Sequence, residues 1–557
     1  MKNILSTISE KVLKNPDKIA FAFMKEDSPG EGYDQITFKE LDEKSSRAAI
    51  LLSRQGFHEG VVTLVLVKPS IDFVILLYGM LKTGAVPLLL PSLNIRSRSG
   101  RRELRKILNR ANPRGVIGTG VNIAINRLLS LSKKTDNVLR FAKLKKFYSN
   151  SDNPTSFDIA SDLDWDESAA FVKYTTGTTG PSKGVIYTHG MLHSHLKLLE
   201  SQGFTDRDVF YGRGGTLIVH PLIGMTSVVN MSSPKQTLGH NIVKTANQWN
   251  VTWTFLSPPS AINLAEYLVG QTNSPISQMI PSIRRLYVGG ESVAAEVVEI
   301  IEPHLSEQRP SEGGFHLVYG ATEGFPLCHA SASTIIGTKH QTSSGMGVCV
   351  GREVGDVQLR ILPFEEASDT KDTTDMVSGT SASQFSIGEI SVNGPVVYSR
   401  LVGGDEGKFG GALSWTFDKN DGTYWHRTGD LGYRDKEGRI WLVGRKSHRV
   451  ELEGGLTLQT KQIEEFYNSL TGLRTALVRG LHGGKPVLLV EKHEGDWLKI
   501  VSIMTEHLAR LSDLFGEDVN LQFIHYNGSF PVDKGHEAKI EREKLNSWTI
   551  EKLRHLE

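Results

Sequence analysis

The most informative segment of this chain is Tyr174-Thr-Thr-Gly-Thr-Thr-Gly-Pro-Ser-Lys-Gly184. Glycines let backbone N–H groups crowd around a polyphosphate, the threonine hydroxyls add donors, and the lysine adds positive charge. The spacing differs from G-x-x-x-x-G-K-[ST], so the stretch is not a Walker loop. A plain Gly/Thr turn would explain Gly-Thr-Thr alone, but not the whole stretch in this order. We therefore expect a phosphate-binding loop that includes Thr175, Thr176, Gly177, Thr178, Thr179, Gly180 and Lys183.

Composition is that of an ordinary globular protein. At 557 residues the chain is too long for one compact core, so we expect about two to four structural units. Its 63 basic and 62 acidic residues nearly cancel, which argues against nucleic acid or an anionic membrane as a partner. The two cysteines, Cys328 and Cys349, cannot build a disulfide framework, and a reducing cytoplasm fits them. The longest apolar stretch, residues 73–90, is interrupted at Lys82, so we expect no transmembrane segment.

Strand and helix patterns alternate along the chain and predict an α/β fold. Such alternation is typical of parallel sheets covered by helices, and it recurs between residues 171 and 351. The predicted elements near the N-terminus are a strand at Ile36–Leu41, a helix at Asp42–Gln55, a strand at Val61–Val67, a helix at Ile71–Leu81 and a strand at Val86–Leu90.

A domain junction is predicted near Ser447. The segment Gly444-Arg-Lys-Ser-His-Arg-Val450 is polar, and a fresh strand–helix pattern starts beyond it. We therefore expect a large N-terminal domain of stacked mixed and parallel sheets over residues 1–446, and a small mobile α+β domain over 447–557. A hinge at Ser447 would need only a few residues to absorb the backbone change.

Further segments follow the glycine-threonine loop in a fixed order: Val288-Gly-Gly-Glu291, Tyr319-Gly-Ala-Thr-Glu-Gly324, Trp425-His-Arg-Thr-Gly-Asp430, Gly444-Arg445 and Phe530-Pro-Val-Asp-Lys-Gly-His-Glu-Ala-Lys539. Taken alone, each of these segments could be an ordinary strand-end turn or a surface charge without a function. Together they resemble the adenylate-forming superfamily, which includes acyl-CoA synthetases, luciferases and the adenylation domains of peptide synthetases.

This resemblance implies ATP and Mg²⁺ as cofactors and gives individual residues roles. By it, Tyr319 stacks on adenine, Thr322 bonds the α-phosphate, and Glu323 holds Mg²⁺ with help from Thr175. Carboxylate and hydroxyl oxygens suit a hard cation that bridges phosphates. Asp430 accepts bonds from the ribose hydroxyls, and Arg445 reaches the ribose or phosphate. The remaining nucleotide-binding residues that it implies are Gly289, Gly290, Glu291, Gly320 and Ala321.

The last motif departs from the family pattern. Most members place a lysine six residues after the proline and directly after a glycine, whereas here Lys539 comes eight residues after Pro531 and follows Ala538. We expect Lys539 to be the catalytic lysine that bridges the acyl carboxylate and the α-phosphate and stabilises the developing charge. Lys534 is the rival candidate.

Residues that could line the acyl pocket are less well marked. A mixture of glycine, threonine and aliphatic residues suits an apolar tail. His220 falls in a pocket region of the family, although a structural histidine explains it about as well. The predicted pocket residues are His220, Gly224, Met225, Ser257 and Cys328.

Within the superfamily the chain is similar to the β-lactone synthetases of bacterial olefin biosynthesis, from Phe38 to Leu545. That resemblance implies adenylation of a β-hydroxy acid, possibly long-chain and supplied by partner enzymes of a biosynthetic pathway. The acid's own hydroxyl would then attack the activated carbonyl to give a β-lactone, AMP and pyrophosphate. A tethered nucleophile needs orientation rather than a second substrate. Glu451 favours this reading mildly, because many CoA-using relatives carry lysine there.

Two other readings stay open. A fatty or aryl acyl-CoA ligase, or an acyl-carrier-protein ligase, would pass the acyl-AMP to a thiol. A non-catalytic nucleotide-binding protein would be expected to lack Glu323, Asp430 or Lys539, and all three residue types are present. A shared fold does not decide between acceptors.

Overall fold

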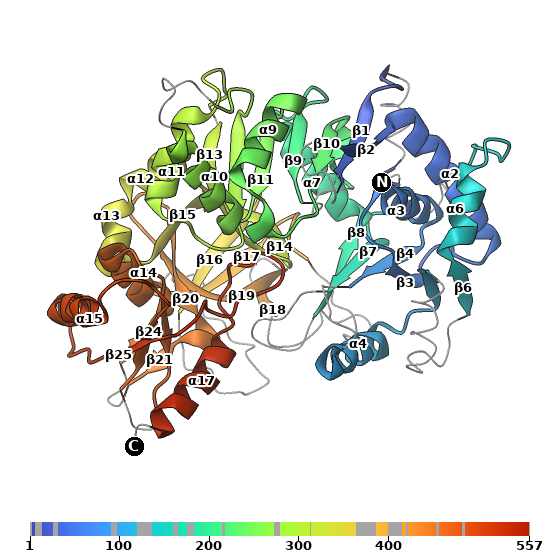
Figure 1. Ribbon diagram of the computed structural model, residues 1–557. Helices are drawn as coiled ribbons and strands as arrows, with labels where there is room; N and C mark the ends of the chain where they lie inside the picture. The colour runs from blue at the N-terminus through green and yellow to red at the C-terminus, as the bar shows by residue number, and fades with distance from the viewer. Residues whose placement is uncertain are drawn as a thin grey trace.

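The computed structural model in Figure 1 describes most of the chain. The described residues are 3–5, 14–25, 32–90, 97–119, 136–159, 165–174, 183–213, 218–271, 279–311, 313–363, 386–398, 415–418, 422–452, 456–481 and 485–555. Residues 175–182 of the predicted phosphate loop therefore lie outside the described residues, whereas Tyr174, Lys183 and Gly184 are described. Within the described part, no helix is long and apolar enough to cross a membrane.

The N-terminal part of the chain builds a six-stranded sheet in the order β6-β5-β3-β4-β7-β8. All its neighbours are parallel except β7 and β8, which form an antiparallel pair on either side of the phosphate loop. Its strands are β3 (Val62–Leu66), β4 (Val86–Leu89), β5 (Gly115–Gly118), β6 (Asn137–Arg140), β7 (Ala169–Tyr174) and β8 (Gly184–Thr188). The accompanying helices are α2 (Phe38–Arg54), α3 (Ile71–Thr83), α4 (Arg98–Ala111), α6 (Phe141–Ser149) and α7 (His189–Ser201).

A fourteen-stranded sheet forms the centre of the molecule. Its strands run parallel from β1 through β10, β9, β11 and β12 to β13, and antiparallel from β13 onward. The strands of the parallel part and its edge are β1 (Ile19–Met24), β2 (Tyr33–Thr37), β9 (Val209–Gly212), β10 (Thr226–Val229), β11 (Trp253–Leu256), β12 (Arg285–Gly289) and β13 (Gly314–Ala321). The rest are β14 (Gly324–Ser331), β15 (Val348–Glu353), β16 (Gln358–Pro363), β17 (Gly388–Asn393), β18 (Trp415–Asp418), β19 (Thr423–Arg434) and β20 (Ile440–Arg445).

Short helices cover this central sheet. α8 (His220–Ile223) leads into β10, and α9 (Gly239–Trp249), α10 (Pro258–Gly270) and α11 (Ala295–Ile301) alternate with the parallel strands. α12 (Ala332–Gly337), α13 (Lys339–Gln341) and the π-helical turn η3 (Thr342–Met346) lead from β14 to β15. Residues of α9, α10 and α11 share one apolar core with strands β11 to β13, which includes Ile242, Leu264 and Val298.

The C-terminal part adds a small three-stranded sheet in the order β23-β24-β25. Its strands are β23 (Thr475–Val478), β24 (Val487–Val490) and β25 (Gln522–His525), and its helices are α14 (Thr460–Thr471), α15 (Trp497–Glu506), α16 (Leu508–Phe515) and α17 (Arg542–Arg554). A two-stranded sheet of β21 (Val450–Glu451) and β22 (Thr457–Leu458) precedes it. Gln462 of α14 donates a 3.0 Å hydrogen bond to the carbonyl of Gly345 in η3, which joins this part to the central sheet.

The prediction of a mixed α/β fold with a large sheet region and a small C-terminal region is confirmed. The first predicted strand and helix had wrong bounds: the strand expected at Ile36–Leu41 is β2 at Tyr33–Thr37, and the helix expected at Asp42 begins at Phe38. The Thr37 side chain accepts from the Glu40 backbone N–H, and the Glu40 carboxylate accepts from the Thr37 N–H. Such a capping box satisfies two backbone donors and so starts the helix early.

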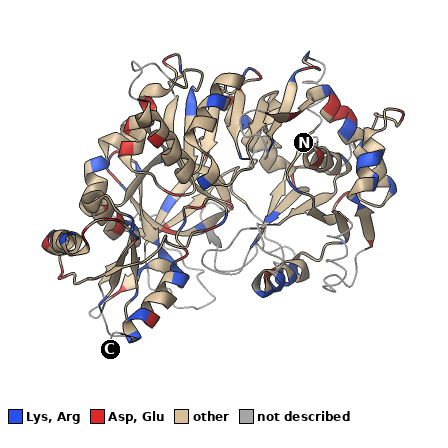
Figure 2. Ribbon diagram, viewed as in Figure 1, with Lys and Arg blue, Asp and Glu red and all other residues tan. Residues whose placement is uncertain are grey.

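Charged residues are spread over most of the molecule in both signs (Figure 2). Along α4, Lys and Arg outnumber acidic residues. Arg98, Arg102 and Arg105 on this helix are exposed, so its basic side chains contribute to a solvated surface.

Candidate active site

A cavity of about 150 Å³ lies where the central sheet meets the C-terminal part. It is lined by strand ends from β12, β13, β19 and β20, by the start of α14, and by the segment that leads into α17. Eight predicted site residues line it: Gly290, Glu291, Tyr319, Gly320, Ala321, Asp430, Arg445 and Lys539. Residues separated by more than a hundred positions in sequence thus come together in one hollow.

Asp430 is the centre of a rigid polar group on one wall of this cavity. Its carboxylate accepts a 2.9 Å hydrogen bond from the Tyr319 hydroxyl and a 2.7 Å bond from Nε of Arg445. Asp430 of β19 and Arg445 of β20 are direct cross-strand partners, so the sheet register fixes their pairing. The charge of Asp430 raises the pKa of Arg445 above its ordinary range, so this guanidinium stays charged. The phenol, carboxylate and guanidinium together suit a polyol next to an aromatic ring.

Lys539 reaches the cavity from a loop that Asp533 organises. The Asp533 carboxylate, which is 4% exposed, accepts from the backbone N–H groups of His536 at 2.8 Å and Lys539 at 2.9 Å. It also accepts from Gly535 and Ala538, and the Asp533 N–H donates back to the carbonyl of Lys539. Burial would raise the pKa of Asp533, but its bonds to His536 and Lys539 hold it well below its ordinary value. Asp533 therefore folds the extra residues of this loop into a fixed shape.

Contacts with the central sheet hold this loop in place. Arg213 donates a 3.1 Å hydrogen bond to the carbonyl of Gly535, and the Glu537 carboxylate accepts from the Lys235 N–H at 2.8 Å. His536 packs directly on Gly290, whose backbone has a φ of +102°. Lys534, the rival to Lys539, is exposed and is absent from the cavity lining.

Thr322 and Glu323 form the turn between β13 and β14, next to the cavity but not in its lining. The Tyr187 hydroxyl donates to the carbonyl of Thr322 at 3.4 Å, and the Tyr398 N–H donates to that of Glu323 at 2.9 Å. Burial, and to a smaller extent the charge of Glu323, raises the pKa of Tyr187 to about 12. The turn that carries Glu323 therefore lies beside Tyr187 of β8, the strand that follows the predicted phosphate loop.

The chemistry of this corner fits a magnesium ion only in part. The described residues contain no group of three His, Cys, Asp or Glu side chains that could hold a metal. One carboxylate, such as that of Glu323, together with phosphate oxygens is nevertheless a donor set that Mg²⁺ accepts in nucleotide sites. The other predicted ligand, Thr175, lies outside the described residues.

The residues predicted for the acyl pocket do not line this cavity. His220 is fully buried between the rings of Phe210 and Trp253, and its Nδ1 lies 3.1 Å from the Ser227 hydroxyl. Burial lowers the pKa of His220 to about 3, so its ring stays neutral. The others are dispersed: Met225 and Cys328 are buried in the core, Gly224 ends α8, and Ser257 precedes α10. Their role in acyl binding stays a prediction.

The remaining predicted positions fall outside the cavity lining or outside the described residues. Gly289 ends β12 beside the ring of Phe255 and is not in the lining. Lys183 is exposed immediately before β8. Ser447 is exposed in the 3₁₀ turn η4 (Lys446–His448), directly after β20. Thr175, Thr176, Gly177, Thr178, Thr179 and Gly180 lie outside the described residues.

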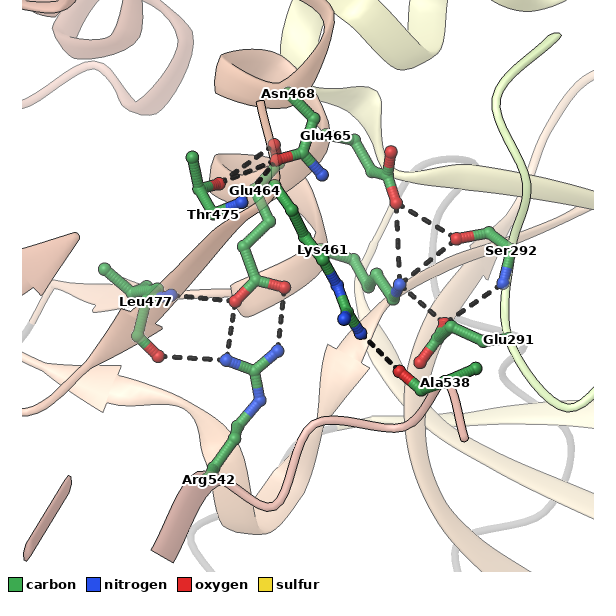
Figure 3. Close-up of polar contacts among 11 residues, drawn as sticks. Glu291, Ser292, Lys461, Glu464, Glu465, Asn468, Thr475, Leu477, Ala538 and Arg542 are labelled. Atoms are coloured by element: carbon green, nitrogen blue, oxygen red, sulfur yellow. Dashed lines mark hydrogen bonds and ion pairs between the residues drawn. The ribbon is translucent and has the colours of Figure 1, made fainter. Parts of the chain in front are cut away.

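Sequence reasoning missed five polar residues that also line the cavity: Ser292, His448, Thr460, Lys461 and Arg542. Figure 3 shows two of them in ion pairs, Lys461 with Glu291 and Arg542 with Glu464. Burial, with the charges of Arg542 and Arg445, lowers the pKa of His448 to about 3. The residues that these side chains contact are distant in the sequence or lie within α14. No short sequence motif therefore identifies them as site residues.

Comparison with known proteins identifies the family of this chain. Residues 8–400 match the family described as AMP-binding enzyme. The chain belongs to this family. It is therefore an adenylate-forming enzyme, which uses ATP to activate a carboxylic acid.

Individual relatives of this AMP-binding enzyme cover nearly its whole length. It is 29% identical to the olefin beta-lactone synthetase of Stenotrophomonas maltophilia, over 99% of this chain and 98% of that protein. It is 28% identical to that of Xanthomonas campestris pv. campestris, with the same coverage. Among solved structures, ATP-bound MatB from Rhodopseudomonas palustris has the same fold, with a TM-score of 0.75 at 19% identity, covering 98% of this chain and 99% of that chain.

Proposed function

We propose that this enzyme adenylates a β-hydroxy acid and closes it to a β-lactone. The observation that carries the proposal is the similarity, over almost the full length of both chains, to two olefin beta-lactone synthetases. In the first step a carboxylate oxygen attacks the α-phosphorus of ATP and pyrophosphate leaves. In the second, the β-hydroxyl oxygen attacks the acyl carbon, the bond to AMP breaks, and the hydroxyl proton is released.

The polar group around Asp430 would hold the nucleoside. Asp430 would accept bonds from the ribose hydroxyls, and Arg445 would keep the carboxylate oriented while reaching toward the ribose or phosphate. Tyr319 would present its ring to adenine, with Gly290, Gly320 and Ala321 giving a flat base room to approach the backbone. The hydrogen bonds of 2.9 and 2.7 Å to Asp430 support this assignment, because they orient both oxygens before any ligand arrives.

The reacting end would be served by charged groups of different origin. Lys539 would bridge the substrate carboxylate and the α-phosphate and stabilise the charge that develops there. Thr322 would bond the α-phosphate. Glu323 would hold Mg²⁺, with Thr175 from the phosphate loop, and the ion would neutralise the phosphate oxygens. Lys539 lines the cavity, whereas Lys534 is exposed and does not. This difference supports Lys539, rather than Lys534, as the proposed catalytic lysine.

We also propose that residues 1–446 and 447–557 are separate domains joined by a hinge at Ser447. Movement there would carry Lys539 into and out of the site, as many enzymes gate their chemistry. Substituting proline at position 447 would restrict the hinge. We expect it to slow one of the two steps selectively, measured as acyl-AMP formation and lactone release in a single turnover.

The deciding experiment tests the acceptor of the acyl group. The protein is incubated with ATP, Mg²⁺ and a syn-2-alkyl-3-hydroxy acid, with and without CoA, and the products are identified by mass spectrometry and NMR. A lactone and AMP formed without CoA are the expected result. A product that needs CoA would overturn the β-lactone proposal and point to an acid–thiol ligase.

A further inference from the structure

Lys461 forms an ion pair with Glu291 across the cavity wall. Its Nζ lies 2.6 Å from Oε1 of Glu291 and donates to the Ser292 hydroxyl at 3.2 Å. That hydroxyl donates in turn to Glu465, one turn further along α14, at 3.1 Å. Figure 3 shows these four residues forming a closed ring between α14 and the turn after β12. The ring thus joins segments about 170 residues apart in the sequence.

This ring is shielded from solvent and borders the reacting centre. The side chains of Lys461, Glu465 and Glu291 are only 19%, 17% and 30% exposed. Lys461, Glu291 and Ser292 line the same cavity as Lys539. A charged group held in such a place interacts strongly with its neighbours, because water screens it poorly.

Both acids that line the cavity, Asp430 and Glu291, have a cation partner. Asp430 pairs with Arg445, and Glu464 outside the cavity lining pairs with Arg542. Among the described residues, no carboxylate oxygen lies within 4.0 Å of the Lys539 ammonium. Glu291 interacts with both lysines of the cavity lining, Lys461 and Lys539. Burial raises the pKa of Glu291, but the charges of Lys461 and, more weakly, of Lys539 lower this pKa to about 2.

We propose that Lys461 is a positioning residue that occupies the Glu291 carboxylate and so keeps the ammonium of Lys539 available to substrate. The inference rests on the proposed role of Lys539. Without Lys461, the charged Glu291 would be left with Lys539, the other lysine in the cavity lining, and pairing there would draw the ammonium away from the carboxylate and α-phosphate. A buried charge that loses its partner either finds another or destabilises the site.

Charge removal on both sides of the ion pair tests this mechanism. Lys461→Met lowers acyl-AMP formation by about 100-fold, the loss expected when one charge at a reacting centre is displaced. Glu291→Gln alone is measured in parallel, because Glu291 lines the cavity and its own effect must be separated from that of Lys461. The double variant Lys461→Met/Glu291→Gln recovers to within about tenfold of wild type, because the competing carboxylate is gone. Lys461→Arg, which keeps the charge, retains most of the activity.

A second readout reports Lys539 itself. An amine-reactive acyl phosphate of ATP labels lysines beside the bound phosphates, and mass spectrometry quantifies the peptide that contains Lys539. Labelling falls in Lys461→Met and returns in the double variant. All variants are compared well below their melting temperatures, because breaking a buried pair also lowers stability. Lys339→Met is the matched control, since its exposed ammonium pairs with Glu296 at 2.8 Å and neither residue is in the cavity lining.

Two results would overturn the inference: full activity in Lys461→Met, or a double variant no better than Lys461→Met with unchanged Lys539 labelling. Both results concern the formation of acyl-AMP and not the group that accepts the acyl chain. Wild-type enzyme that makes acyl-AMP but no lactone would therefore refute the proposed function and leave this comparison intact.

Discussion

The site is built from two regions that hold their charged groups by different means. Asp430 and Arg445 lie on neighbouring strands of a fourteen-stranded sheet, and the register of that sheet fixes their pairing. Lys539 lies on a loop with no regular structure, and one buried carboxylate, Asp533, gives that loop its shape. A sheet fixes a group permanently, whereas a loop tied by its own side chain can move as a unit. The first suits binding of a nucleotide, and the second suits a group needed for one step.

The largest effect is expected from Lys539→Ala. Acyl-AMP formation should fall by about a thousandfold, because a preorganised charge at the reacting centre is lost. AMP binding, measured by calorimetry, should change little, because Asp430, Tyr319 and Arg445 remain. The exposed Lys534→Ala is the control. Adenylation that survives in Lys539→Ala and disappears in Lys534→Ala would reverse the assignment.

Asp430→Asn should weaken nucleotide binding instead. We expect the KM for ATP to rise about 10- to 100-fold, since a charge-assisted acceptor for the ribose is lost and Arg445 loses its counterion. The matched control is Asp435→Asn, which breaks bonds to Arg439 and Trp441 at the far end of the same strand pair. It should lower thermal stability and leave the KM unchanged. An equal rise of KM in both variants would show that sheet integrity, not ribose binding, is responsible.

Asp533→Asn should affect turnover more than binding. The amide keeps an acceptor oxygen but loses the charge that attracts several N–H groups, so the loop becomes less ordered. We expect the kcat of adenylation to fall about tenfold with little change in the KM for ATP. Glu537→Gln, which keeps the acceptor for the Lys235 N–H, should be close to wild type. A change in KM alone would contradict the separation of the two regions.

The smallest effect is a pH dependence of stability from His448. Its pKa is about 3 in the folded protein, below the ordinary value of 6.5, so the unfolded chain binds a proton first as the pH falls. Stability from this residue is therefore complete above about pH 6.5 and is lost as the pH falls toward 3. Urea unfolding at pH 7 and pH 5 should show a smaller difference in His448→Gln than in wild type. An identical difference would mean that other groups dominate.

Much of the site was predictable because its motifs are local. Tyr319, Asp430, Arg445 and Lys539 each belong to a short run of residues whose chemistry is recognisable, and all four line one cavity. The strand–helix alternation likewise predicted the parallel strands, since apolar periodicity is a local signal.

The rest depends on contacts that no local pattern encodes. Lys461 and Glu291 pair across a long sequence separation, and Lys461 looks like an ordinary helix residue when it is read along α14. The shape of the Lys539 loop depends on hydrogen bonds from backbone N–H groups of the loop to the Asp533 carboxylate. The unusual spacing between Pro531 and Lys539 indicated a different loop but did not predict these bonds. Helix α2 began early because the capping box at Thr37 outweighed the hydrophobic pattern.

The loop that carries Lys539 packs on Gly290 through His536. A methyl group there would lie 2.5 Å from Cδ2 of His536, and the φ of +102° disfavours any side chain. Alanine at position 290 should therefore act as a spacer that keeps the C-terminal loop away without touching Asp533 or Lys539. Such a variant would hold the loop in an undocked position, so that the proposed movement at Ser447 is stopped by one carbon atom.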